Sequence, residues 1–190
     1  AINGNPAYYS PLVDIHVFGI SSLATNKEVA EQRKKEGKET WIYHCCSPYP
    51  PMPNRHLDES LTSSRLYPWY AYKYKATGFL HWGANVYRGA DPYKTSIGPL
   101  PGGGQNPGHP PGDNWFLYPG PEGLRGSLRM MALREGFLDH TLLIMLAQKD
   151  EKKAEEIMNQ IARSLIDYEK NPQAYHQARK HILNILDDIN

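Results

Sequence analysis

The sequence lacks several features that would place it in a common functional class. It has only two cysteines, Cys45 and Cys46, and because they are adjacent a disulfide between them has unfavourable geometry. It also lacks any Cys-x-x-Cys motif and any Cys/His spacing typical of a zinc site. We therefore predict two buried free thiols, no metal and no cofactor.

An excess of one charge and long hydrophobic runs are also missing. Lys and Arg number 21 against 20 Asp and Glu, so nothing favours nucleic acid or an anionic membrane as a partner. The chain has no apolar run of about 18 residues, so no membrane-spanning helix is predicted. It shows no signal peptide and begins at Ala1 rather than at a Met, which we interpret as a processed or truncated start.

Aromatic residues and proline are plentiful instead. The chain has 13 Tyr, 4 Trp and 16 Pro but only 4 Phe. Tyr and Trp combine a flat apolar face with a polar edge, which suits sugar rings but equally suits packing between a sheet and helices. The length of 190 residues fits one domain but is short for an eight-stranded barrel, which needs roughly 250.

Three short runs rich in β-branched and aromatic residues predict strands, and helical segments separate them. We expect strands over residues 12–18, 41–46 and 78–82, and helices over 27–36, capped by Asn26, and about 58–75. This alternating order predicts an α/β fold with parallel strands and right-handed crossovers. Three strands leave two unpaired edges, so we expect a missing N-terminal barrel half or a homodimer partner to complete the sheet.

The second half of the chain changes character. Residues 83–121 are rich in Gly and Pro and predict a long loop, which at this length is functional or disordered. From Ser127 the apolar spacing predicts three helices, with Asp139 paired to Arg134 or Arg129 and the last two helices antiparallel on the barrel wall. The predicted organisation is a partial barrel over residues 1–148 and a helical pair over residues 149–190.

Candidate binding residues follow from the expected sheet. In parallel barrels, functional side chains lie at the carboxyl ends of strands and in the loops that follow. The resulting mixture of imidazole, aromatic, amide and carboxylate groups fits a neutral polyhydroxylated ligand better than a phosphate or a metal. The set is His16, Tyr43, His44, His81, Trp82, Asn85, Asp113, Asn114 and Trp115. Each also has a structural interpretation, such as a core histidine or, for Asp113, a turn.

The adjacent carboxylates Asp58 and Glu59 are the other candidates. Paired carboxylates can do acid–base chemistry. They also precede a predicted helix, where Asp caps the first turn and Glu interacts favourably with the helix dipole. The residues alone leave both interpretations open.

Six segments, in this order and spacing, resemble the C-terminal half of the glycoside hydrolase family 123 catalytic domain, also met as a bacterial domain of unassigned function. The resemblance covers roughly residues 11–148, and no single segment is specific. The segments are Val13–Val17; Trp41–Cys45 with Pro48, Pro50 and Asn54; Leu57 and Asp58 with Arg65 and Trp69; Gly78–Trp82 with Asn85; Gly112 and Asp113 with Leu117–Gly120; and Ser127–Arg129 with Leu133–Gly136 and Asp139.

The resemblance implies a (β/α)8 barrel, of which this chain is the C-terminal portion, and cleavage of terminal β-linked N-acetylgalactosamine. The implied mechanism is substrate-assisted: the 2-acetamido oxygen attacks the anomeric carbon, one carboxylate orients the acetamido group, and a neighbouring glutamic acid protonates the leaving oxygen. In the family that Asp-Glu pair precedes the segment matching Val13–Val17, so we expect it upstream of Ala1. The isolated chain is therefore expected to be inactive, and the role does not transfer to Asp58 and Glu59.

The resemblance also implies a glycan containing N-acetylhexosamine as the partner, no cofactor, and a secreted or periplasmic location. In the implied pocket wall, Trp82 stacks on the sugar, Tyr43, His44 or Asn85 bonds its hydroxyls, and Asp113 and Trp115 close the site. The chain departs from the family pattern at His81, Asn114 and His140, which leaves the preferred sugar open.

Three other interpretations stay open. The chain is a non-catalytic carbohydrate-binding module built from part of a barrel, a structural half-barrel that completes its sheet by dimerising, or an enzyme in which Asp58 and Glu59 are the acid pair after all. Sugar binding, turnover and the effect of Glu59→Gln distinguish them.

Overall fold

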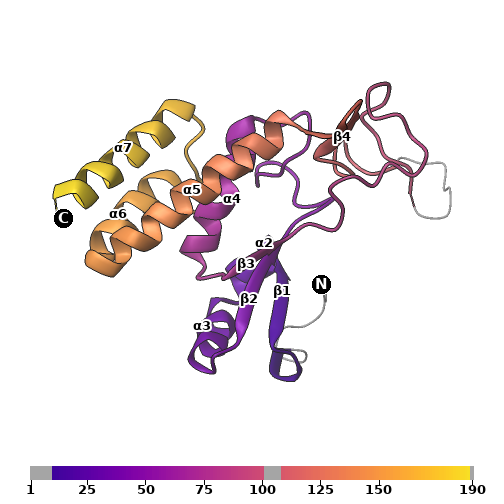
Figure 1. Ribbon diagram of the computed structural model, residues 1–190. Coiled ribbons are helices and arrows are strands. Elements are labelled where there is room, and N and C mark those ends of the chain that lie inside the picture. Colours follow the sequence, from indigo (N-terminus) through magenta and orange to yellow (C-terminus); the bar gives the residue numbers. More distant parts are fainter. Residues whose placement is uncertain (1–9, 101–107, 189–190) are drawn as a thin grey trace.

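The computed structural model describes residues 10–100 and 108–188. A sheet lies at one end of the molecule, helices α4 to α7 lie side by side on one flank, and loops with a small hairpin form the other flank (Figure 1). The elements in chain order are η1 (Ser10–Leu12), β1 (Ile15–Gly19), α2 (Ile20–Thr25), α3 (Lys27–Lys35), β2 (Glu39–Tyr43), α4 (Leu61–Lys73), β3 (Gly78–Leu80), β4 (Leu117–Gly120), β5 (Gly123–Gly126), α5 (Leu128–Lys149), α6 (Glu151–Ile161) and α7 (Pro172–Asp188).

The sheet is parallel, as the alternation of strands and helices predicted. Its order is β1-β2-β3, with Phe18 opposite Ile42 and Ile42 opposite Phe79. Burial alternates along β1 and β2, so one face packs against helices. The second strand ends at Tyr43 rather than at Cys46, because the Cys45 amide donates to the Ser47 carbonyl in a turn instead of to a neighbouring strand.

The connection between β1 and β2 differs from the prediction in one respect. A short helix, α2, precedes α3. Asn26 is the N-cap residue of α3, as predicted, but its side chain donates to the Ser22 carbonyl at 2.7 Å and makes no hydrogen bond to the first turn of α3. The Arg33 side chain from α3 donates to the carbonyls of Val13, Asp14 and Glu39. It therefore fixes the helix to the amino ends of both strands.

Helix α4 forms the centre of the core. Ser60 is its N-cap, accepting from the Thr62 amide at 3.3 Å, and every residue from Thr62 to Tyr72 is buried. Helix α5 crosses α4 at Gly136, where an added Cβ would stand 2.2 Å from the Arg65 carbonyl oxygen. The two helices approach this closely only because that position is glycine.

The C-terminal helices extend this core. Helix α6 packs against α4 and α5, and α7 packs against α5 and α6. The buried Asp139 of α5 pairs with Arg65 of α4 (2.7 Å) and Arg179 of α7 (2.5 Å), so its predicted pairing with Arg134 or Arg129 was wrong. The reason is that tertiary packing brings arginines from two other helices to the face of α5 that carries Asp139.

The long loop is less irregular than expected. Its end forms the antiparallel hairpin β4–β5, and Asn85 makes an isolated bridge to Trp115. Sequence analysis missed the hairpin because Pro and Gly in Pro119–Gly123 suggest only a turn. The triple glycine Gly102 to Gly104 lies outside the described residues.

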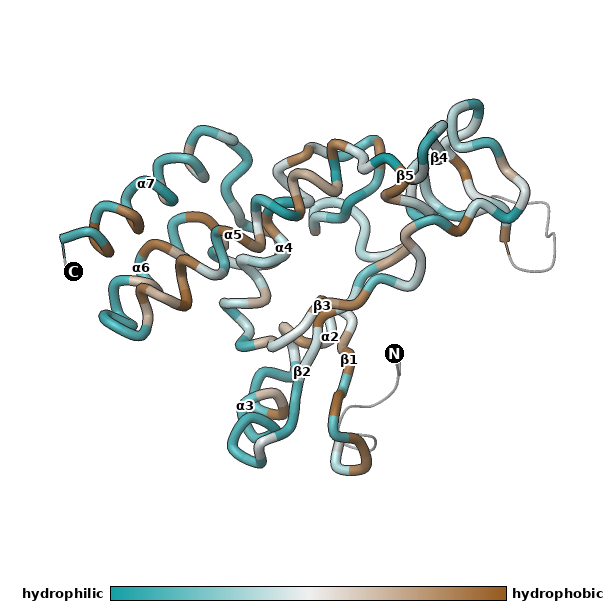
Figure 2. The backbone as a smooth tube through the Cα atoms, viewed as in Figure 1, coloured by the Kyte–Doolittle hydropathy of each residue, from teal (hydrophilic) through white to brown (hydrophobic). Residues whose placement is uncertain are grey.

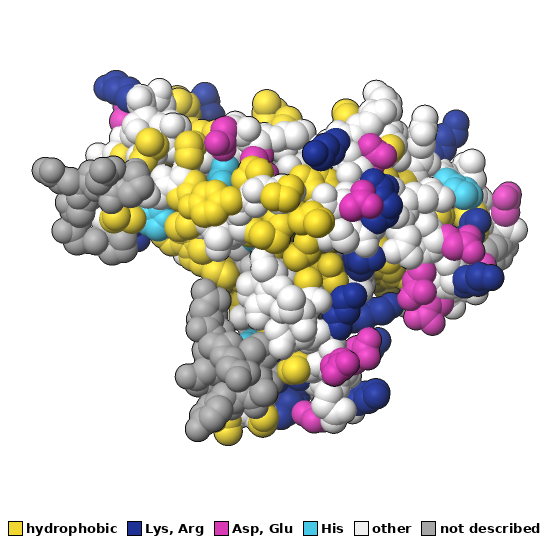
Figure 3. Space-filling model, turned by 180° about the vertical axis from the view of Figure 1, so that it is seen from behind, with side chains coloured by type: hydrophobic (Ala, Val, Ile, Leu, Met, Phe, Trp, Pro, Cys, Tyr) yellow, Lys and Arg dark blue, Asp and Glu magenta, His cyan; other side chains and the backbone are white. Residues whose placement is uncertain are grey.

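Much apolar surface stays exposed on α5. Hydrophobic residues occur all around this helix (Figure 2), and yellow side chains gather across the middle of the rear face of the molecule (Figure 3). The exposed large residues of α5 are Leu128, Met130, Met131, Phe137, Leu138, Ile144 and Met145. Over residues 10–100 and 108–188, none of the helices has the length and hydropathy needed to cross a bilayer.

Candidate functional site

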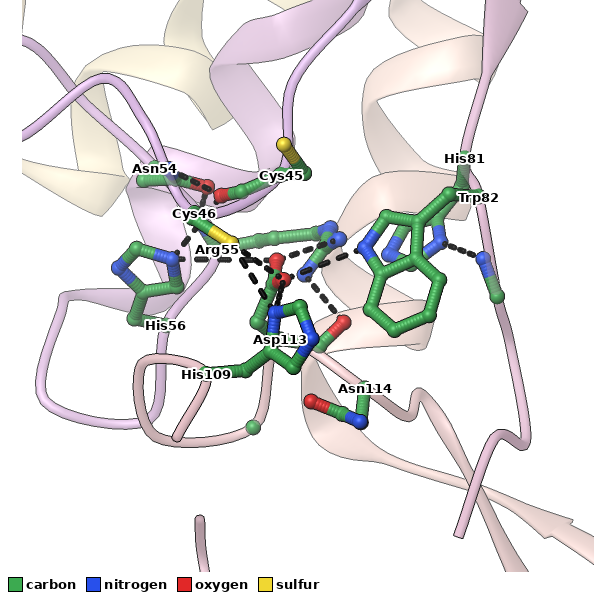
Figure 4. Close-up of polar contacts among 12 residues, drawn as sticks. Cys45, Cys46, Asn54, Arg55, His56, His81, Trp82, His109, Asp113 and Asn114 are labelled. Carbon is green, nitrogen blue, oxygen red and sulfur yellow. Dashed lines mark hydrogen bonds and ion pairs between the residues drawn. The ribbon is translucent and has the colours of Figure 1, made fainter. Parts of the chain in front are cut away.

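Three segments that are distant in sequence meet beyond the carboxyl ends of β2 and β3. They are the turn after β2, the residues that follow β3, and the loop around residue 110 (Figure 4). Their side chains converge on one carboxylate. We call this group the Asp113 cluster: Cys46, Arg55, Trp82, His109 and Asp113.

Asp113 is completely buried and holds its two oxygens in different environments. Arg55 Nη2 lies 3.0 Å from Oδ1, and the indole Nε1 of Trp82 donates to Oδ2 at 3.2 Å. Arg55 is itself only 1% exposed, and burial lowers the pKa of its guanidinium to about 10. The pair is therefore a buried ion pair, which requires close geometry to offset the loss of hydration.

The thiol of Cys46 and the ring of His109 lie on the other side of Asp113 Oδ2. Cys46 Sγ is 3.0 Å from His109 Nδ1 and 3.4 Å from Asp113 Oδ2, and His109 Nδ1 is 3.4 Å from the same oxygen. The imidazole stacks on Trp82, with ring centres 4.9 Å apart. Burial, followed by the charge of Asp113, raises the pKa of the Cys46 thiol to about 12. Both cysteines are free thiols, as predicted, but they are half-buried rather than buried.

The backbone of the cluster is held by side chains that reach in from outside it. The Asn54 amide donates to the carbonyls of Cys45 (2.8 Å) and Pro48 (2.9 Å). Arg129, in the first turn of α5, donates to the carbonyls of Arg55, Gly112 and Trp115 at 2.7–2.8 Å.

Gly112 is required for this arrangement. Its φ is +74°, and an added Cβ would stand 2.7 Å from the Arg129 guanidinium. Any other residue would both strain the turn that precedes Asp113 and displace Arg129.

The carboxylates predicted as an alternative acid pair lie outside the cluster. Asp58 is exposed. Glu59 is half-buried, its Oε2 accepts a hydrogen bond from the Asn54 backbone N–H at 2.6 Å, and burial raises its pKa. His56 stands between the two carboxylates of Glu59 and Asp113, with Nδ1 3.7 Å from Glu59 Oε1 and Nε2 4.0 Å from Asp113 Oδ1. Glu59 therefore supports the turn after β2 rather than facing Trp82.

Of the residues predicted from sequence, Trp82 and Asp113 are brought into contact. Tyr43 ends β2, and burial followed by a hydrogen bond with Cys45 raises the pKa of its phenol. Trp115 is fully buried and pairs with the exposed Asn85 through the backbone, so these two lie at the edge of the site.

Two of the three histidines predicted on the strands, His16 and His44, lie outside the Asp113 cluster. His16 is the second residue of β1, so it stands at the amino end of that strand and not at its carboxyl end; its ring stacks on Phe18 at 3.9 Å. His44 is buried against Tyr67 of α4 at 3.7 Å, on the helix-covered face. The alternation of neighbouring strand residues explains why Tyr43 and His44 do not share a face.

Sequence reasoning missed Cys46, Arg55 and His109 as site residues. Cys46 belongs to a vicinal pair, Arg55 follows a proline-rich segment, and His109 lies in a Gly/Pro-rich loop. No sequence pattern connects these three positions. The only pattern that indicates a special role is Asn54-Arg55-His56, three polar residues directly after a proline-rich segment. All three are buried, which is unusual for such residues.

The Asp113 cluster contains one carboxylate only. Aromatic faces, an indole N–H and imidazole nitrogens suit stacking and hydrogen bonding to a sugar. A substrate-assisted glycosidase needs two carboxyl groups in different environments, so the cluster alone does not constitute such an acid pair. The acid pair expected upstream of Ala1 lies outside the described residues, which begin at residue 10, and its position stays a prediction.

Comparisons with known proteins identify the family and the fold. The family described as "Glycoside hydrolase 123, catalytic domain" matches residues 3–146. The chain is similar in structure to a family 123 glycoside hydrolase from Clostridium perfringens, studied for glycolipid glycan hydrolysis, with a TM-score of 0.69 and 18% identity. The match covers 98% of this chain and 34% of that chain, so this chain spans about a third of its length. No curated protein matches the sequence.

Proposed function

This chain belongs to the glycoside hydrolase 123 catalytic-domain family, and from that premise we propose that it supplies part of the sugar-binding wall of a hydrolase. The proposed substrate is a terminal β-linked N-acetylgalactosamine. The observation that carries the proposal is the convergence of the ends of β2 and β3 and the long loop on Trp82 and Asp113. Ligands of barrel enzymes bind at this end of the strands.

The fold we propose for the whole protein is a (β/α)8 barrel, of which β1, β2 and β3 are the C-terminal portion. Two observations support it. Strands β1 and β3 each have one neighbour in the described sheet, which leaves two open edges. Helix α5 exposes several large hydrophobic side chains, which is typical of a surface that further protein covers. We propose that residues 149–190 form an added helical pair, since the family match ends at residue 146.

Within the pocket we assign separate roles to the residues. Trp82 stacks on the apolar face of the sugar, and Tyr43 and Asn85 bond its hydroxyl groups. Asp113 holds the Trp82 indole in place through its Oδ2. The buried Trp115 supports the floor, while His16 and His44 pack in the sheet and contact no ligand.

The catalytic acid and its carboxylate partner belong, in this proposal, to a part of the barrel upstream of Ala1. The isolated chain then binds weakly and does not hydrolyse. Because the Clostridium perfringens protein acts on glycolipid glycans, the same class of substrate is the one we propose for the complete protein.

Turnover of an aryl β-N-acetylgalactosaminide tests the proposal. The complete reading frame should hydrolyse it and the 190-residue chain should not, since the latter lacks the acid pair. Glu59→Gln in the complete protein is the control and should keep full activity, because Glu59 supports a turn.

Three outcomes would contradict the proposal. Loss of activity in Glu59→Gln would assign the acid to this chain. Sugar binding without turnover in the complete protein would indicate a carbohydrate-binding module. A chain that dimerises and binds no sugar would indicate a structural half-barrel, since open strand edges favour assembly.

A further inference from the structure

We propose that Cys46, His109 and Asp113 form a binding site for one divalent cation of the zinc class. The proposal does not require hydrolase activity, although Asp113 also holds Trp82 in the proposed sugar pocket. It is formed by the turn after β2, which supplies the thiol, and by one turn of the long loop, which supplies the imidazole and the carboxylate (Figure 4). Spacing in the sequence gave no indication of it, because 63 positions separate Cys46 from His109.

The ligand atoms are already placed for tetrahedral coordination. With metal–sulfur bonds of about 2.3 Å and metal–nitrogen or metal–oxygen bonds of about 2.0–2.2 Å, ligand atoms in a tetrahedral zinc site lie roughly 3.3–3.6 Å apart. The three separations here are 3.4 Å, 3.4 Å and 3.0 Å. Closing the site requires the thiol and the imidazole to move apart by about half an ångström.

Without a cation, the three atoms can form a chain of two hydrogen bonds, from His109 Nδ1–H to Cys46 Sγ and from the thiol to Asp113 Oδ2. That chain leaves the 3.4 Å contact between His109 Nδ1 and Asp113 Oδ2 without a hydrogen bond. A cation between the three atoms would interact with all of them at once. Thiolate, imidazole and carboxylate are the three ligand types that zinc accepts.

Residues next to the three proposed ligands hold the carboxylate and the imidazole in position. Arg55 Nη2 holds the other carboxylate oxygen of Asp113 at 3.0 Å, and Trp82 donates to Oδ2 and stacks on the imidazole. Arg88 Nη1 lies 3.4 Å from His109 Nε2 but also donates to the Pro99 carbonyl at 2.7 Å. Since Arg88 is exposed, it can keep the Pro99 contact when Nε2 carries the ring hydrogen.

The occupied site carries one net positive charge. A divalent cation offsets the Cys46 thiolate and the Asp113 carboxylate, Arg55 beside Asp113 remains as the extra positive charge, and the proton of the thiol leaves to solvent. Three protein ligands leave one position for water or a ligand hydroxyl. The cation would tie the long loop to the end of β2 beside Trp82.

Cobalt(II) provides the direct test, because a thiolate ligand gives it a strong charge-transfer absorption in the near ultraviolet. Tag-free, reduced 190-residue chain is freed of metal and titrated with Co²⁺ and then Zn²⁺. We expect saturation at one equivalent, loss of the band on adding Zn²⁺, and the same result for Cys45→Ser. Cys46→Ser should lack the band, and His109→Ala should bind at least tenfold more weakly.

Thermal unfolding gives a second readout that does not depend on colour. Zn²⁺ at about a hundredfold excess over Kd should raise the Tm of the wild-type chain and of Cys45→Ser by roughly 5–10 °C, but not that of Cys46→Ser. Far-ultraviolet circular dichroism checks that each variant is folded. Absence of a one-equivalent band, a band that survives in Cys46→Ser, or equal loss in Cys45→Ser would each overturn the site, the last by indicating chelation by the vicinal thiols.

Discussion

Two buried aspartates in this molecule have the same kinds of partner and very different surroundings. Asp139, among the helices, accepts from Arg65, Arg179 and the Trp69 indole at 2.5–3.2 Å. Asp113, at the end of the sheet, has one arginine and one indole at 3.0–3.2 Å, and then a thiol and an imidazole. Both carboxylates are fully buried.

The difference lies in how completely the polar groups around each aspartate are paired. Each Asp139 oxygen accepts two hydrogen bonds from side chains of α4 and α7. Around Asp113, several buried atoms have no hydrogen-bond partner among the described residues. They include His81 Nε2, Asn114 Oδ1, Trp115 Nε1 and Arg55 Nε, and also Arg55 Nη2 and Asp113 Oδ1, which form an ion pair without hydrogen-bond geometry. Unpaired buried polar groups cost stability, so they persist where a ligand or a function uses them.

The polar groups of the helical region around Asp139 are paired within the fold, whereas those around Asp113 include unpaired atoms that the proposed sugar site would use. Four variants, from the largest expected effect to the smallest, can break or sharpen this distinction.

Asp139→Asn should have the largest effect on the free energy of unfolding, a loss of about 3–5 kcal/mol, because it leaves buried Arg65 and part of Arg179 without a counter-charge. Chemical denaturation measures the loss. Asp167→Asn, which removes only the exposed pair with Arg163, is the matched control and should cost less than about 1 kcal/mol.

Asp113→Asn should cost less, about 1–3 kcal/mol, because Arg55 keeps its bond to the Asp113 carbonyl and its position over the Phe116 ring. The same denaturation experiment decides between the two aspartates. A loss as large as that of Asp139→Asn would remove the proposed distinction between the regions.

His81→Gln should reduce the amount by which the free energy of unfolding falls between pH 6.5 and pH 5. Burial lowers the pKa of His81 to about 2, below the value near 6.5 of the unfolded chain, so its contribution is complete above pH 6.5 and is lost as the pH falls. Between pH 6.5 and 5 this amounts to roughly 2 kcal/mol, at about 1.4 kcal/mol per pH unit. Denaturant unfolding at both pH values measures this difference, and His176→Gln, at an exposed position, is the control. An equal change in stability with pH in the wild type and in His81→Gln would refute the prediction.

Trp82→Ala should give the smallest of the four expected changes, and the quantity that changes is the free energy of sugar binding. In the complete protein we expect sugar affinity to fall about tenfold, or ~1.4 kcal/mol, through the loss of aromatic stacking. Calorimetric titration with N-acetylgalactosamine measures it, and Tyr49→Ala, an exposed aromatic outside the cluster, should bind normally. Unchanged affinity would exclude Trp82 from the pocket.

Local sequence patterns predicted helices and strands well where the residues that determine an element lie within that element or next to it in sequence. The helix expected from about residue 58 begins at Leu61 with Ser60, not Asp58, as its cap, and the helical pattern expected from Ser127 begins with that residue as the cap of α5. The parallel order of β1, β2 and β3 follows from alternation with helices. The hairpin β4–β5 escaped prediction because its strands contain Pro and Gly, which disfavour strands in isolation.

The candidate site was predicted only in part, for the same reason. The rule that function lies at strand ends and in the loops that follow selected both Trp82 and Asp113, and the two are in contact. It misplaced His16, because β1 begins three residues later than its apolar run and so puts that histidine at the amino end. Cys46, Arg55 and His109 could not be grouped, since no periodicity connects residues that meet only through the fold.

The amino-acid sequence by itself determined the class of fold, the helix starts and the resemblance to family 123, because propensity, capping and alternation act over a few neighbouring residues. Only the tertiary structure decided which arginines neutralise Asp139 and Asp113 and which thiol meets which imidazole. Burial and pairing of charge depend on atoms brought together across 40 to 74 positions of chain, and it is their packing that sets the distances on which the chemistry depends.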